Sequence, residues 1–139
     1  MCAWGSVPME ASVPYYFAKS LDMPFSEATE AAIAALKTHG FGVLTRIDVK
    51  ATMKEKIGAE FRPYVILGAC NPQMAHKALE AEDKIGTMLP CNVIVQERNG
   101  KSEVAAVDPV ASMQAIENPA LASIAAEVRS RLKATIDSL

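Results

Sequence analysis

Two of the three cysteines in this 139-residue chain are the residues best suited to chemistry, because each stands at the boundary of an apolar segment. Cys70 follows the apolar run 64–69 and precedes Asn71 and a proline, which together are typical of a helix start. Cys91 opens the next apolar run. Helix N-termini carry unpaired N–H groups that stabilise a thiolate and lower the pKa of the thiol. We therefore expect Cys70 to be the better nucleophile, redox centre or soft-metal ligand of the two.

Both cysteines also have a simpler interpretation, because free cysteine is among the most buried residue types and often only packs. The helix expected between them has about 12 residues and a length of roughly 18 Å. A parallel crossover would place Cys70 and Cys91 at opposite ends of a sheet. The segment 85–90 could instead lead Cys91 back to Cys70, or a dimer could pair them between chains. The sequence leaves this choice open.

Three polar residues extend the candidate ligand site. Asn71 and Asn92 each directly follow one of the two cysteines, and His76 lies one turn into the helix that begins after Cys70. From there His76 could assist the thiol as a base or share a metal ion, whereas a histidine facing solvent is the simpler interpretation. An anion could also bind at this helix N-terminus. The histidine and cysteine spacings match no dedicated metal motif, and no cofactor is indicated.

Composition excludes several functional classes. The net charge is −2 and the basic residues are spread along the chain, so no basic patch for nucleic acid is present. No apolar run approaches the roughly 20 residues that a membrane helix needs. The odd number of cysteines, without a C-x-x-C pair, is typical of free thiols in a reducing compartment. We expect a cytoplasmic protein, although the N-terminal residues would also fit the remnant of a processed precursor.

The length fits one domain with one hydrophobic core, and half of the residues are hydrophobic. We expect residues 1–12, which include Cys2 and Trp4, to be a disordered leader. Residues 13–139 are expected to form a single α/β domain.

Apolar periodicity and cap residues predict the element order β-α-β-α-β-α-β-β-α-α. Strands are predicted at 15–21, 41–49, 64–69, 91–96 and 103–107, and helices after Ser26, at 51–57, and from Pro72, Pro109 and Pro119 onward. The third of these helices should stop before Gly86 and the fourth near Ile116. Asn99-Gly100 predicts a tight antiparallel hairpin. This order indicates an α+β fold, a two-layer α/β sandwich in which a mixed sheet of about five strands has helices packed on one face.

The segments Phe41–Leu44, Gly68–Pro72 and Leu89–Val93, together with Asp48, resemble the domain-of-unknown-function 302 family. The likeness covers roughly Tyr15 to Pro109, and the motifs GACNP and LPCNV are its specific part. The family positions carried over are Cys70, Asn71, Pro72, Pro90, Cys91 and Asn92. The resemblance implies a compact α/β domain that forms homodimers, and it implies no agreed activity.

Three functions fit these observations. The first is a small homodimeric domain that binds a small molecule, an anion or a soft metal near Cys70. The second is a cysteine-dependent redox protein or enzyme in which Cys70 attacks and Cys91 resolves. The third is a structural dimerisation module in which both cysteines only pack. The burial and mutual placement of the two thiols distinguish these functions.

Overall fold

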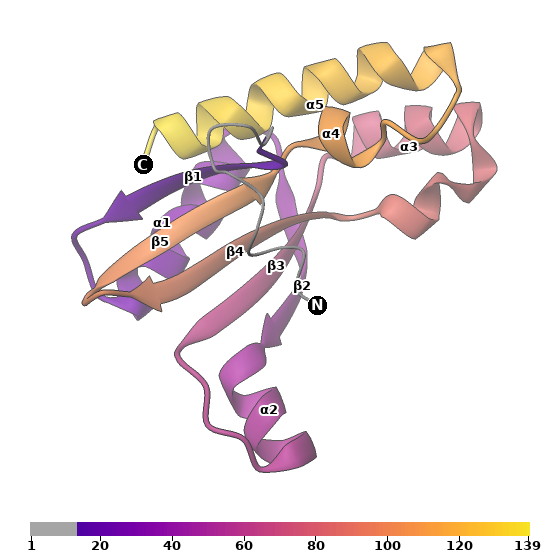
Figure 1. Cartoon of the computed structure of the whole chain (residues 1–139). Helices are drawn as coiled ribbons and strands as arrows, with labels where there is room; N and C mark the ends of the chain where they lie inside the picture. The colour runs from indigo at the N-terminus through magenta and orange to yellow at the C-terminus, as the bar shows by residue number, and fades with distance from the viewer. Residues whose placement is uncertain (1–13) are drawn as a thin grey trace.

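A five-stranded sheet with helices against one face makes up the computed structural model, which describes residues 14–139 (Figure 1). The leader predicted at 1–12 lies outside the described residues. The elements are β1 (Tyr16–Leu21), α1 (Phe25–Thr38), β2 (Gly42–Asp48), α2 (Val49–Ile57), β3 (Tyr64–Cys70), α3 (Pro72–Ala81), the 3-10 helix η3 (Asp83–Met88), β4 (Cys91–Arg98), β5 (Lys101–Val107), α4 (Pro109–Ser112) and α5 (Pro119–Asp137).

The strands lie in the order β1-β5-β4-β3-β2, and all four neighbouring pairs are antiparallel. The predicted α+β sandwich of five strands is confirmed, whereas the expectation of a mixed sheet is wrong. The physical reason lies in the connections. The segments between β2 and β3, and between β3 and β4, each return the chain to the end of the sheet that it has just left. Adjacent strands therefore run in opposite directions.

The core lies between the sheet and helices α1 and α5. Alternate residues of the central strands point to this side, as the period of a strand requires, and Leu67 of β3 and Val95 of β4 are fully buried there. Leu36 of α1 and Leu132 of α5 belong to the same buried cluster. Ala28 and Ala32 of α1 are buried in the same cluster, and their small side chains let this helix lie close to the sheet.

Two predicted helices differ from the observed ones. The helix that begins at Pro109 ends at Ser112 rather than near Ile116. The helix that begins at Pro72 ends at Ala81 rather than just before Gly86, and residues 83–88 form the separate 3-10 helix η3. The short α4 is held by Asp108, whose Oδ1 accepts from Val110 N at 3.0 Å and whose Oδ2 accepts from Arg129 Nε at 3.1 Å. Within residues 14–139, no helix combines the length and the hydrophobicity needed to cross a membrane.

Helix α2 projects from the rest of the fold (Figure 1). Asp48 caps it, because its Oδ1 accepts a hydrogen bond from Ala51 N at 2.9 Å, and Gly58 ends it with a left-handed φ of 65°. Asp48 therefore has a local structural role at this strand end. No residue of α2 is buried, so its packing within one chain contributes little to its stability.

Gly68 of β3 allows an unusually close approach of the segment that precedes β4. A Cβ atom on Gly68 would lie 2.7 Å from Pro90 Cγ and 2.2 Å from Thr45 Oγ1. Real Cβ atoms do not approach carbon that closely, so a side chain at this position would displace the proline ring. Because Pro90 directly precedes Cys91, Gly68 sets how closely the start of β4 approaches β3.

We predict that Gly68→Ala lowers the free energy of unfolding by about 1–3 kcal/mol, the usual cost of an overpacked core position. Urea unfolding followed by circular dichroism measures the change. Gly42→Ala is the matched control, because Gly42 lies on the adjoining strand and a Cβ there has no other atom within 4 Å. The control should stay within about 0.5 kcal/mol of the parent chain. Equal losses in the two variants would contradict this account.

Candidate functional site

Antiparallel pairing of β3 with β4 places the two cysteines at the same end of the sheet. Ala69 of β3 lies opposite Cys91 of β4, so Cys70 is one residue away from the position facing Cys91. Helix α3 and η3 lead the chain away from the sheet and back to this end (Figure 1). The parallel crossover, which would have separated the cysteines by the length of α3, does not form. The chain itself therefore brings Cys70 and Cys91 to one end of the sheet, and no second chain is needed to do so.

Both cysteines line a small cavity between this end of the sheet and helices α3 and α5. Its volume is about 30 Å³, which exceeds the roughly 10–15 Å³ that a cavity needs to hold one water molecule. The lining is apolar except for Asn71, and it contains no charged side chain. Two thioethers, those of Met74 and Met113, lie in the wall together with the two thiols. The cavity therefore offers soft sulfur atoms and very little space.

Burial dominates the electrostatics of both thiols. Cys91 is 9% exposed, and burial, with a smaller contribution from the nearby Cys70 thiol, raises its pKa to about 11. Cys70 is half-buried, and burial raises its pKa as well. The expected lowering of the Cys70 pKa by the helix N-terminus is therefore wrong in direction. The reason is that the surroundings are apolar and that Asn71 Oδ1 already accepts a hydrogen bond from Met74 N at 3.1 Å.

Asn71 joins the start of α3 to its surroundings. It is buried, and its side chain satisfies one of the free N–H groups of the first helical turn, as the sequence predicted for a cap. Its amide nitrogen also packs against Gly40, which has a φ of 89°, at a distance of 3.0 Å from the place that a Cβ would occupy. The position of α3 relative to Cys70 is thus set by a buried amide rather than by an ion pair.

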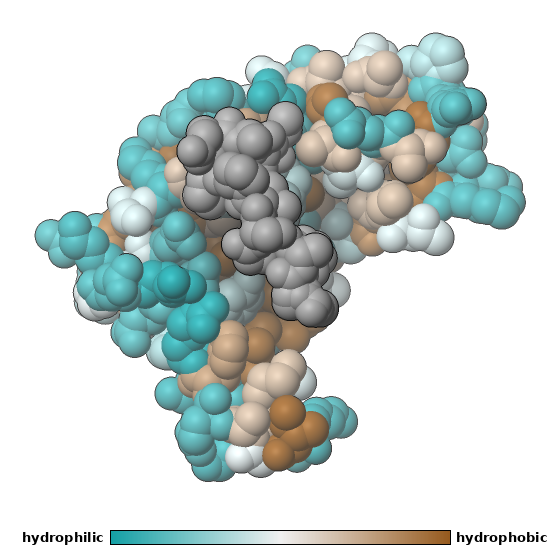
Figure 2. Space-filling model, in the orientation of Figure 1, coloured by the Kyte–Doolittle hydropathy of each residue, from teal (hydrophilic) through white to brown (hydrophobic). Residues whose placement is uncertain are grey.

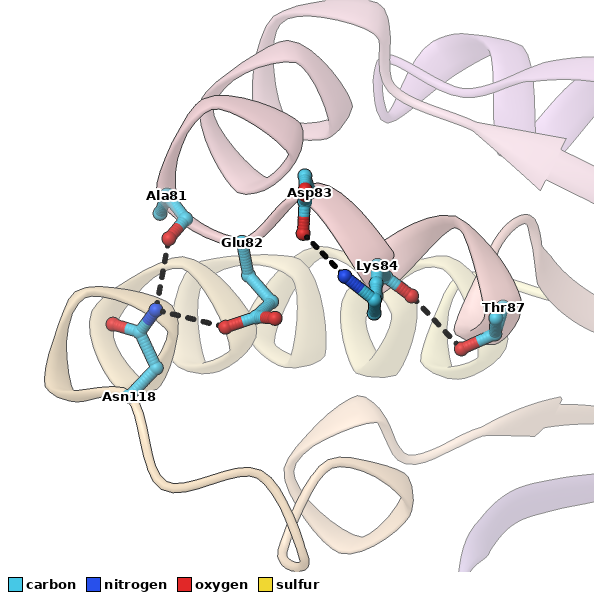
Figure 3. A network of polar contacts seen from close by, with 6 residues as sticks. All are labelled: Ala81, Glu82, Asp83, Lys84, Thr87 and Asn118. Atoms are coloured by element: carbon cyan, nitrogen blue, oxygen red, sulfur yellow. Dashed lines mark hydrogen bonds and ion pairs between the residues drawn. The ribbon is translucent and has the colours of Figure 1, made fainter.

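The C-terminal end of α3 is held by Asn118, which precedes the first residue of α5 (Figure 3). Asn118 Nδ2 donates to the carbonyl oxygen of Ala81 at 2.9 Å and to Glu82 Oε1 at 3.3 Å. Its Oδ1 accepts from Ala120 N at 3.1 Å. The sequence predicted only that a helix begins at Pro119, directly after Asn118. Asn118 also holds the end of α3 against α5. The residues that it contacts there are more than 30 positions away, so no local sequence pattern predicted this contact.

A second buried cluster attaches η3 to helices α3 and α5. Ile85 is fully buried and packs with Ala78 of α3 and Leu121 of α5. Within η3, Thr87 Oγ1 donates to the carbonyl oxygen of Lys84 at 2.9 Å (Figure 3). The connection from α3 to β4 is therefore attached to α3 and α5 through Ile85, while most of its other residues are exposed.

The other candidate ligands lie outside the cavity. The His76 side chain is 77% exposed, and its Nε2 lies 3.9 Å from Glu80 Oε1, so it faces solvent. Asn92 is exposed and lines a hollow on the open face of the sheet, since neighbouring residues of a strand point to opposite faces. Among residues 14–139, no group of three or more histidine, cysteine, aspartate and glutamate side chains is placed to hold a metal.

A family match and a solved structure with a similar fold both support the α+β architecture described above. Residues 17–139 match the family described as "Domain of unknown function DUF302", a match that extends past Pro109 and includes α5. The fold is similar to the "Crystal structure of uncharacterized conserved protein DUF302 from Bacillus stearothermophilus", with a TM-score of 0.84 and 32% sequence identity. The likeness covers 90% of this chain and 98% of that one. No curated protein matches the chain.

We predict that stability falls between pH 9 and about 11 because of Cys91. The folded state keeps this thiol neutral, whereas the unfolded state releases the proton at the ordinary pKa of 9.0. The stabilisation is therefore complete below pH 9 and is lost as the pH approaches 11, to an extent of at most roughly 3 kcal/mol. Urea unfolding of the parent chain and of Cys91→Ala across this range isolates the thiol from titrating lysines and tyrosines. Parallel pH profiles of the two proteins would contradict the prediction.

Proposed function

The chain belongs to the DUF302 family, and from that premise and the geometry of the cavity we propose that it is a binding domain whose ligand is held by the sulfur atoms of Cys70 and Cys91. One observation carries the proposal. Two cysteines from neighbouring antiparallel strands line the same small, nearly apolar cavity. If the cysteines only packed, there would be no reason for both thiols and two thioethers to line one cavity.

The size and polarity of the cavity restrict the ligand. Pockets for metabolites have volumes of roughly 300–1,000 Å³, so a cavity of about 30 Å³ admits a single atom or a very small group. An anion would need donors or positive charge, and the wall supplies only the amide of Asn71. The class that remains is a thiophilic atom, bound directly by sulfur.

Reversible disulfide formation between the two thiols is the second candidate function, since the same geometry brings the cysteines together. The attacking species in that chemistry is a thiolate, and burial raises the pKa of both Cys70 and Cys91. The electrostatics therefore support ligand binding better than rapid thiol exchange. The reducing cytoplasm that we expect from the sequence would keep both thiols free for a ligand.

We predict that trivalent arsenic, added as arsenite, binds with a stoichiometry of one per chain and protects both Cys70 and Cys91 from alkylation. Each As–S bond forms as a thiol proton combines with an arsenic hydroxyl and leaves as water, and a neighbouring second thiol closes the chelate. Native mass spectrometry and peptide mapping after alkylation measure the binding.

Controls separate this proposal from simple thiol reactivity. Cys70→Ser and Cys91→Ala should each abolish arsenite retention, with thermal melting confirming that the variants are folded. Cys2→Ser, which removes the third thiol of the chain, should leave retention unchanged. Full retention by either single variant of the pair, or no retention by the parent chain, would contradict the proposal and favour the structural role.

We also propose that the domain is a homodimer, with α2 and the open sheet face covered by a second copy. Ile57 of α2 is 73% exposed, and Leu44 and Ile47 are exposed on β2, which is an edge strand. Figure 2 shows apolar surface on the projecting α2 and on the part of the sheet next to it. An edge strand and a helix without buried residues gain stability when a partner chain covers them.

We predict that the parent chain sediments with twice the chain mass and that Ile57→Asp weakens this association at least roughly tenfold, because a charge would then be buried without a partner. Leu79→Asp is the control, since Leu79 is an exposed leucine on α3, at 43%. Sedimentation velocity over a concentration series measures both. A monomeric parent chain, or equal weakening by the control, would contradict the proposed interface.

A further inference from the structure

We propose that the cavity is a site for one Cu(I) ion, held by the sulfur atoms of Cys70, Cys91 and Met74. The inference rests on the proposed function, in which the paired thiols bind a small thiophilic ligand, and it names that ligand. Cysteine thiolates and methionine thioethers are the ligands that Cu(I) prefers, whereas oxygen and nitrogen ligands favour harder ions. The wall of the cavity offers four sulfur atoms and, apart from Asn71, no polar side chain.

The number of thiolates favours Cu(I) over Zn²⁺. A structural zinc site takes four cysteine or histidine ligands, and this cavity has two cysteines and no histidine. His76, the nearest histidine along the chain, is exposed to solvent. A monovalent soft ion is satisfied by two thiolates and one thioether, which is the set that the wall can supply.

Met74 is the methionine placed to act as the third ligand. It packs against the buried cluster that contains Cys91, whereas Met113 packs against the separate cluster of Ile85 and Leu121. The backbone of Met74 is fixed in the first turn of α3 by its hydrogen bond to Asn71 Oδ1. Long side chains in helices point back toward the helix N-terminus, which for Met74 is the direction of Cys70.

The binding step balances without a further reactant. Two S–H bonds break and their protons leave to solvent, two Cu–S bonds form to the thiolates, and the Met74 thioether donates one electron pair. No electron is transferred, and Cu(I) with two thiolates carries a net charge of −1. The ion neutralises one of the two thiolates, which lowers the cost of holding them in the apolar wall.

We predict that anaerobic titration with Cu(I) against a chromogenic competing chelator gives one tightly held ion per chain, with an absorption spectrum of all-sulfur coordination. Met74→Leu should lower the affinity at least roughly tenfold, in the range known for weakened metal sites, while arsenite capture by the two thiols stays unchanged. Met88→Leu is the control, because Met88 is 42% exposed and does not line the cavity.

The outcomes separate this inference from the proposed function. If arsenite is captured but Cu(I) is lost to the chelator, the copper assignment fails and the paired-thiol function stands. If neither is retained, both fail. Equal affinities of Met74→Leu and the parent chain would also overturn the assignment, since the thioether would then be part of the wall and not a ligand.

Discussion

The close antiparallel pairing of β3 with β4 is the constraint on which the site depends. Gly68 has no side chain, so Pro90 packs directly on β3 and Cys91 begins its strand beside the end of the neighbouring one. The chain must leave the sheet after Cys70 and return to the same end. Helix α3 and η3 form this connection, and the hydrogen bond from Asn118 to Ala81 holds the end of α3 in place. A connection that crossed the sheet would build the same elements and leave the two thiols far apart.

Two opposing influences act on the Cys70 thiol, and their relative size decides whether its pKa is raised or lowered. A helix N-terminus stabilises a nearby anion by about 0.3–1 kcal/mol at an exposed site, whereas removal of a charged group from water costs considerably more. Here the helix end is already capped by Asn71 and the wall is apolar, so burial determines the direction of the pKa. Such a thiol is a poor nucleophile at neutral pH. It becomes a good ligand only for an ion that displaces its proton.

Local sequence signals predicted much of the fold. The turn at Asn99-Gly100 has positive φ at both residues, 53° and 78°, and joins β4 to β5 as expected. Asn71 caps α3 as predicted. Strand direction was not predictable, because the return of β4 depends on contacts between Asn118 and the end of α3, far apart in sequence. The same limit applies to the site. Cys70 and Cys91 were identified from their boundaries, whereas the contribution of Met74 to the cavity follows only from the packing of α3.

Strand β4 serves two surfaces at once. Cys91 points to the helix-covered face and lines the cavity, whereas the next residue, Asn92, points to the open face and lines a hollow of about 440 Å³. Ile94 lines the same hollow, and Val93 between them is buried in the core. A second copy bound as proposed above would pack on the same strand that contributes Cys91 to the cavity. The two surfaces are therefore built on one continuous strand, with Val93 and Val95 of that strand buried in the core.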